Sequence, residues 1–168
     1  KKVSKYTMKT SFNWLKNIIS INLPANKIAE ILTDIGLEVE RTEEYYSVKG
    51  GIVGLLIGEV VSKEKHPKAD RLNLTRVKIS NAITLQIVCG ANNVEKEQKV
   101  VVAPIDSTLH PLDGDSFKIK KSKIRGVESM GMICAEDEIG LGKSHDGILV
   151  LNNNAKIGQK ASEYFNIE

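Results

Sequence analysis

Between residues 52 and 151 the sequence alternates short apolar segments with residues typical of tight turns, which leaves no room for long helices. The segment from Ile52 to Ser62 is apolar on both faces and contains two glycines, as expected of a bent strand that contributes to two sides of a small barrel. Residues 83–89 alternate between apolar and polar side chains, the pattern of a strand with one buried face. We therefore expect a small β-barrel here rather than a parallel sheet with crossover helices.

Turn-forming residues divide this region into five predicted strands. They occur at residues 66–67, 80–82, 90–93, 104 and 112–115. In the second strand the apolar parity changes near Thr75 and Arg76, where we expect a β-bulge. Five short strands favour a Greek-key barrel of the OB type, so the predicted fold class is mainly β with flanking α-helices.

The residues after the fifth strand are expected to close the barrel. Residues 132–139 have apolar side chains at the spacing of a short helix that would cover one barrel end, and Gly140 and Gly142 would terminate it. Residues 148–151 form the last predicted strand, and residues 158–165 form a terminal helix or extension.

The first fifty residues predict two short amphipathic helices. Ser11 is suited to cap the first helix, and the second runs from Pro24 to Gly36. Both carry apolar residues at helical spacing on one face. Two such helices are too few to enclose a core, so their apolar faces must pack on another part of the protein.

The pair Gly50–Gly51 is turn-prone, and we interpret it as a domain boundary because the composition changes after it. Residues 50–155 are predicted to be the OB module. Residues 8–49 and 156–168, the two ends of the chain, are predicted to form together a small α/β subdomain that the module interrupts. Residues 1–7 are interpreted as a leader or tag remnant, with Met8 as a candidate native start.

Positive charge is concentrated in two stretches, although the net charge of the chain is only +3. Residues 116–126 contain five cations and no acid, and residues 63–78 contain six cations and two acids. The first stretch is predicted to be one twisted strand with a bulge near Lys121–Ser122, so that its cations point outward. A phosphate backbone could follow such a line of charge, although a solvated strand face explains the pattern as well.

Phe117 is the only aromatic residue between Gly51 and Ala155. Its strand parity predicts that it points into the barrel, so stacking of bases on an exposed aromatic ring is not expected. Any nucleic acid bound here would be held through its charge and backbone shape.

The sequence gives no support for a metal site, a membrane segment or an independent catalytic site. Cys89 continues an apolar strand face and is predicted to be a buried thiol, and no cysteine or histidine spacing of the structural zinc type occurs. No apolar run is long enough to span a membrane, which favours a cytoplasmic protein with reduced thiols. No nucleophile–base pair or glycine-rich phosphate loop is visible, so we predict no catalytic residue.

Several segments resemble the tRNA-binding OB module shared by several aminoacyl-tRNA synthetases and their accessory proteins. They are residues 58–60, 66–72, 85–91, 120–129, 131–132, 138–142 and 145–148. Residues 11–15 and 32–40 are similar to the opening of the bacterial phenylalanyl-tRNA synthetase beta subunit, in which an OB module is inserted into an N-terminal domain.

This resemblance implies that the chain is an N-terminal fragment whose module contributes to tRNA binding during aminoacylation. It also implies a partner alpha subunit, in a heterotetramer of two alpha and two beta chains, and a requirement of the whole enzyme for ATP and magnesium. No cofactor is expected for the fragment itself. The candidate tRNA-binding residues are Lys118, Lys120, Lys121, Lys123, Arg125, Lys63, Lys65, Lys68, Arg71 and Ser129.

Two other readings remain open at this point. The barrel could be a structural or interaction domain that braces a synthetase without touching tRNA, because OB barrels host many functions. It could also be a stand-alone tRNA-binding protein of the same module family. The second reading is less favoured, because such a protein would not need the helix that contains Asn13, Trp14 and Leu15.

Overall fold

The computed structural model describes residues 8–167, and the chain divides into two compact units. The first unit ends at Glu44 and the second begins at Tyr45, so the predicted boundary at Gly50–Gly51 falls just inside the second unit. These two glycines lie in the 3-10 turn η1 (Lys49–Ile52) with φ values of 72° and 62°. A side chain on Gly50 would overlap the ring of His110, so the close packing of this turn requires glycine.

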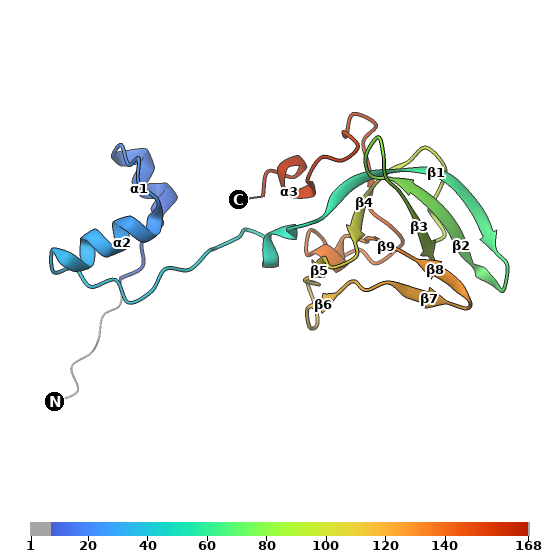
Figure 1. Cartoon of the computed structure of the whole chain (residues 1–168), viewed down its shortest axis with the longest axis horizontal. Coiled ribbons are helices and arrows are strands. Elements are labelled where there is room, and N and C mark those ends of the chain that lie inside the picture. The colour runs from blue at the N-terminus through green and yellow to red at the C-terminus, as the bar shows by residue number, and fades with distance from the viewer. Residues whose placement is uncertain (1–7, 168) are drawn as a thin grey trace. The chain divides into compact units, whose positions relative to one another are not determined.

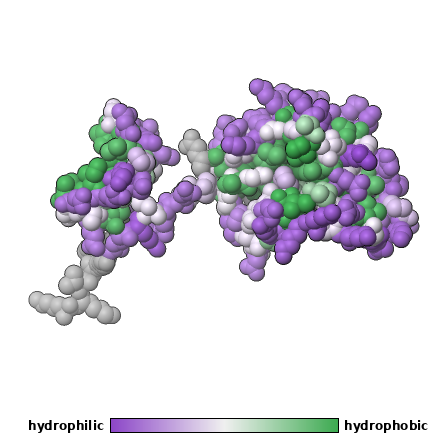
Figure 2. Space-filling view, viewed as in Figure 1, coloured by the Kyte–Doolittle hydropathy of each residue, from purple (hydrophilic) through white to green (hydrophobic). Residues whose placement is uncertain are grey.

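The first unit contains the two predicted helices, α1 (Phe12–Ile18) and α2 (Ala25–Asp34). The hydroxyl of Ser11 accepts a hydrogen bond from the Trp14 amide at 3.3 Å, which confirms the predicted N-cap. Neither helix buries a residue, and Trp14, Ile18 and Ile35 are all more than half exposed. Figure 2 shows the resulting hydrophobic surface on this unit. The expectation that residues 8–49 share a subdomain with residues 156–168 stays a prediction.

The second unit is built on an antiparallel sheet (Figure 1). Five strands follow one another in the order β10–β4–β1–β2–β3, and β9 also pairs with β4. Their bounds are β1 (Leu56–His66), β2 (Ala69–Lys78), β3 (Thr84–Cys89), β4 (Lys99–Pro104), β9 (Gly131–Ile133) and β10 (Val150–Leu151). The described chain is thus mainly β with a few short helices, as predicted.

The segment around β8 (Val127–Ser129) connects β3 with β9 through hydrogen bonds. The Met130 amide donates to the carbonyl of Gln86 at 2.8 Å, and the Gln86 side-chain amide donates to the carbonyl of Glu128 at 2.9 Å. Since β9 pairs with β4 on its other side, this segment lies between the two strands β3 and β4.

Strands β1 and β4 contribute to two hydrophobic cores, one on each face. Ile57 and Val101 pack in one core, and Val60 and Val100 pack in the other. The first core is covered by the end of the chain, which includes the helix α3 (Ala161–Tyr164). The Ala161 amide donates to the carbonyl of Leu55 at 2.9 Å. The prediction that the first strand serves two apolar sides is therefore confirmed.

The predicted bulge in the second strand is wrong. Asn73, Thr75 and Val77 are all buried at alternate positions, so β2 keeps one parity from Asn73 to Val77. The register shifts of the β1–β2 pair lie elsewhere, between Val60 and Ser62 and between Lys65 and His66. Thr75 can occupy a core position because its hydroxyl donates to the carbonyl of Ile87 at 2.8 Å.

The basic stretch is not a single bulged strand, which corrects a second expectation. It contains two short strands, β6 (Phe117–Lys118) and β7 (Ser122–Ile124). They pair with different partners, β5 (Thr108–Leu109) and β8, in two separate sheets. Residues 119–121 therefore form a connection rather than a bulge.

Residues 132–139 do not form one helix, which corrects a third expectation. They divide into the end of β9 and a short 3-10 helix, η2 (Asp137–Ile139). Gly140 follows η2 with a φ of 70°, so the predicted glycine termination is confirmed. None of the helices between residues 8 and 167 is both long and apolar enough to span a membrane.

Candidate nucleic-acid interface

Two hairpins from distant parts of the sequence meet at a buried histidine. His66 ends β1 and is only 4% exposed. Its Nδ1 accepts a hydrogen bond from the Lys68 amide at 3.1 Å, and its Nε2 lies 3.1 Å from the carbonyl oxygen of Ile124 in β7. Because Nδ1 acts as an acceptor, Nε2 must carry the proton and donate to Ile124, which fixes a neutral tautomer.

This contact brings the two basic stretches together. The turn after β1 carries Lys68, and the turn after β7 carries Arg125 and Gly126. A side chain built on Gly126 would lie 3.8 Å from the ammonium of Lys68, so the two turns are adjacent. Arg125 and Gly126 have positive φ values of 46° and 93°, which turn the chain tightly at this point. Both stretches therefore contribute cations to the region where the β1–β2 and β7–β8 hairpins meet.

The predicted cations divide into paired and unpaired groups. Three of them form ion pairs: Lys118 with Asp106 at 2.8 Å, Lys121 with Glu128 at 3.1 Å, and Lys63 with Glu95 at 2.7 Å. Six exposed cations have no ion-pair partner among residues 8–167; we call them the free basic set. It consists of Lys65, Lys68, Arg71, Lys120, Lys123 and Arg125. Their charge is available to a phosphate without prior loss of an internal pair.

Ser129 differs from the other candidate residues because it is only 2% exposed. Its hydroxyl accepts from the Val88 amide at 3.1 Å and donates to the carbonyl of Gly131 at 3.0 Å. Its hydrogen bonds thus join β3 to the start of β9. The structure gives Ser129 a role in the fold, and its contact with tRNA stays a prediction.

Phe117 is 41% exposed, so the prediction of an inward-facing ring is wrong. It lies in a two-residue strand that pairs with β5, where strand parity does not enforce burial. An exposed aromatic ring next to Lys118 can stack on a base, a contact that sequence parity had excluded.

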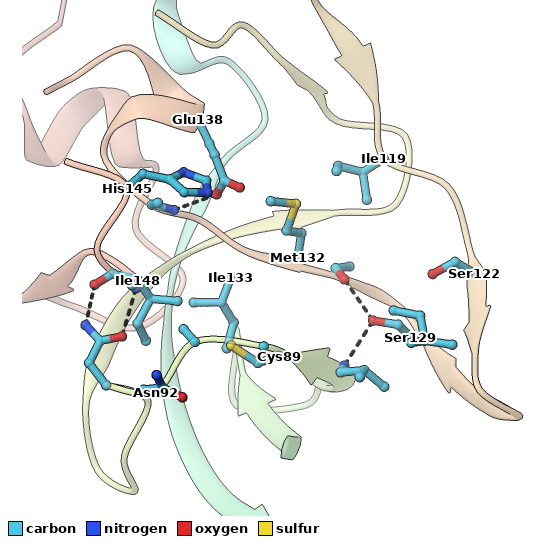
Figure 3. Close-up of a pocket in the computed structure, with 18 of the residues that line it drawn as sticks. Cys89, Asn92, Ile119, Ser122, Ser129, Met132, Ile133, Glu138, His145 and Ile148 are labelled. Atoms are coloured by element: carbon cyan, nitrogen blue, oxygen red, sulfur yellow. Dashed lines mark hydrogen bonds between the residues drawn. The ribbon is translucent and has the colours of Figure 1, made fainter. Parts of the chain in front are cut away.

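Beside the basic segment lies an open cavity of about 790 Å³, which is within the usual range for ligand sites. Figure 3 shows Glu138 and His145 at one end, Ser122 and Ser129 at the other, and Met132 between them. Lys118 and Lys120 also line it. Sequence reasoning missed this site, although residues 138–142 and 145–148 were already among the segments that resemble the tRNA-binding module.

Glu138 is the most perturbed acid of the cavity. Its Oε2 accepts a hydrogen bond from the Ala135 amide at 2.7 Å. Burial raises the pKa of Glu138 above its ordinary value, and this effect outweighs the lowering by that hydrogen bond. At the same end of the cavity, Nδ1 of His145 lies 2.9 Å from Oδ2 of Asp137.

Among residues 8–167, no three histidine, cysteine, aspartate or glutamate side chains are grouped so that they could hold a metal ion. Cys89 and Cys134 are free and buried, which confirms the prediction for Cys89. Burial raises the pKa of both thiols, so neither is a reactive thiolate.

Comparison with known proteins identifies the second unit. A family model described as "Putative tRNA binding domain" matches residues 55–160, which contain β1 to β10 and both basic stretches. The chain belongs to this tRNA-binding domain family. The family assignment agrees with the module predicted from the sequence.

Curated relatives of this tRNA-binding domain protein are longer chains. The phenylalanine–tRNA ligase beta subunit of Bacteroides fragilis is 52% identical over 162 residues, which cover 96% of this chain and 20% of that protein. The corresponding subunit of Porphyromonas gingivalis is 48% identical over 161 residues, with the same coverage. The chain therefore spans about a fifth of the length of these relatives. Among solved structures, a MetRS related protein from Pyrococcus horikoshii matches with 20% identity and a TM-score of 0.46, over 64% of this chain and 87% of that one.

Removal of the His66 ring is expected to destabilise the contact between the β1–β2 and β7–β8 hairpins of the tRNA-binding domain. In His66→Ala the Lys68 amide and the Ile124 carbonyl lose their partner, which should lower the free energy of unfolding by about 1–3 kcal/mol. His66→Asn can retain the acceptor for Lys68 and should lose less. Urea denaturation of the three proteins measures this order, and equal stability of His66→Ala and the wild type would contradict it.

Replacement of Glu138 by glutamine is expected to change how stability depends on pH. The folded pKa is raised above its ordinary value of 4.5, so the wild type is most stable, relative to the variant, below that pH. As the pH rises through the folded pKa, the wild type must ionise a partly buried carboxyl, whereas glutamine stays neutral. The melting temperature of Glu138→Gln minus that of the wild type should therefore increase from about pH 4 to pH 8. A constant difference over this range would contradict the expected sign.

Proposed function

We propose that this chain is the tRNA-binding module of the beta subunit of a phenylalanine–tRNA ligase, and that the free basic set holds phosphates of tRNA. The observation that supports this surface is the contact of His66 with Ile124, which brings cations of two distant stretches to one end of the barrel. Phosphate contacts position a nucleic acid without reading its sequence, so discrimination of the cognate tRNA lies elsewhere in the enzyme.

We infer that the strands form a five-stranded barrel of the OB type. The pairings β1–β2, β2–β3 and β1–β4 join four consecutive strands of this barrel. The segment of β8 and β9 would close the barrel, because this segment forms hydrogen bonds with β3 on one side and with β4 on the other. We also infer that residues 8–49 and 156–168 belong to one subdomain interrupted by the module of residues 50–155. The exposed apolar side chains of α1 and α2 support this, since such helices need a partner to be stable.

For the whole enzyme we propose the activity of its curated relatives, ligation of phenylalanine to tRNA with ATP and magnesium. The alpha subunit would be its partner, in a heterotetramer of two alpha and two beta chains located in the cytoplasm. The support is the identity of 52% to a phenylalanine–tRNA ligase beta subunit along nearly the whole of this chain.

The experiment is a titration of labelled tRNA with the purified chain at several salt concentrations. Each neutralised phosphate should add roughly 0.7–0.9 to the slope of log affinity against log salt. With about four contacts the slope should be near −3, and the dissociation constant on the order of micromolar or weaker. Absence of salt-dependent binding would contradict this function and favour a barrel that braces the enzyme without touching tRNA.

A further inference from the structure

The lining of the cavity beside the basic segment includes apolar side chains on both faces of β9. Met132 and Ile119 lie on the side of the first core, and Ile133, Cys89 and Ile148 lie on the side of the second (Figure 3). Met132 is only partly buried, so part of its thioether side chain is accessible to a flat, apolar group. Thioether and aliphatic groups pack well on the face of an aromatic ring. A nucleobase has such a face.

One end of the cavity carries a hydrogen-bond acceptor. Glu138 uses Oε2 for the Ala135 amide, and no residue between 8 and 167 donates to its Oε1. Among the described residues, the fully buried side-chain atoms that lack a hydrogen-bond partner belong to Asn73 and Asp137. Oε1 of Glu138 is not one of them, so this oxygen is accessible. A carboxylate oxygen in this position accepts an exocyclic amino group, as cytosine N4 or adenine N6 presents.

The lining of the cavity also carries positive charge. Lys120, a member of the free basic set, lines the cavity. Lys118 also lines it and forms an ion pair with the exposed Asp106. A nucleotide whose base enters the cavity would therefore have cations close to its phosphate. This combination of an accessible apolar side chain at Met132, an acceptor and nearby cations matches a nucleotide better than a purely apolar ligand.

We propose that this cavity receives one unstacked nucleobase that carries an exocyclic amino group, with the amino group donating to Glu138 and the adjoining phosphate contacting Lys120. The inference rests on the proposed tRNA-binding function and adds a base-reading site to it. RNA is recognised in this way at loops and ends, where bases can leave the helical stack.

Cytidine and uridine 5′-monophosphate are the matched probes, because uracil presents a carbonyl oxygen where cytosine presents its amino group. The chain contains three methionines, so ¹³C-methyl methionine labelling gives a small set of signals. Titration with cytidine monophosphate should shift the Met132 methyl signal through the ring current of the base. Met8 and Met130 do not line the cavity and should not shift. Uridine monophosphate should bind about tenfold more weakly, because its oxygen would face the carboxylate.

Glu138→Gln keeps an acceptor for the Ala135 amide but can also donate to uracil. This variant should lose about tenfold in affinity for cytidine monophosphate and none for uridine monophosphate. No Met132 shift with either nucleotide, or equal affinities for both in the wild type, would overturn the proposal, even if tRNA binds to the basic surface. A Met132 shift without any binding of tRNA would instead keep the nucleotide site and overturn the proposed function.

Discussion

Replacement of Lys120, Lys123 and Arg125 by glutamate is expected to weaken tRNA binding by about 100-fold at low salt. Each of these cations is exposed and has no ion-pair partner in the described part of the chain, residues 8–167. Charge-assisted contacts contribute on the order of 1 kcal/mol or more each. Loss of three phosphate contacts should also reduce the salt dependence from a slope near −3 to about −1. Fluorescence anisotropy with labelled tRNA at several salt concentrations measures both quantities.

The matched control changes the net charge equally at exposed lysines outside the interface. Lys9, Lys96 and Lys156 are suited, and their replacement by glutamate should reduce affinity far less. Both variants should keep the thermal stability of the wild type, because exposed charges contribute little to folding. The interface variant should weaken cognate and unrelated tRNA equally, since phosphate contacts carry no sequence information. If it binds tRNA like the wild type, the basic surface is only solvated and the module acts as a structural brace.

Local patterns in the sequence predicted the parts of the fold that depend on near neighbours. The turn at residues 80–82 forms because the Ser80 hydroxyl accepts from the amides of Ala82 and Ile83, at 3.3 and 3.1 Å. The cap at Ser11 and the termination at Gly140 are equally local. The apolar faces of β1 were recognisable because a strand of eleven residues repeats its pattern several times.

The errors arise where a polar residue is buried or a strand is very short. Asn73 and Thr75 lie in the interior of the sheet, so the parity of β2 could not be read from Leu72 and Leu74. Phe117 was misplaced because β6 has only two residues, too few to enforce alternation.

The candidate site could be predicted only in its residue types. Its geometry depends on the contact between His66 and Ile124, which are 58 residues apart in the sequence. The cavity depends likewise on Glu138, Lys120 and the loop after β3, which the fold brings together from three segments. Nothing local in the sequence encodes these contacts.

Gly58 in β1 is the first residue of a segment that resembles the tRNA-binding module. Its inward position faces the core between β1, β2 and β4. A side-chain carbon there would lie 2.7 Å from Val77 Cγ1 and 2.8 Å from Val102 Cγ2, closer than real contacts allow. Both valines are fully buried, so neither can move without disturbing the core. Glycine is therefore required by packing and not by a special backbone angle.

Gly58→Ala should lower the free energy of unfolding by about 2 kcal/mol, which corresponds to about 5–10 °C in melting temperature. Gly90→Ala is the matched control, because its added carbon would meet only Leu72 Cδ2, at an ordinary 3.5 Å. That variant should be unchanged or slightly more stable, since alanine restricts the unfolded chain. Thermal denaturation followed by circular dichroism separates the two outcomes. If Gly58→Ala is as stable as Gly90→Ala, the core around Val77 and Val102 adapts to an extra methyl group, and the glycine must be explained by something other than packing.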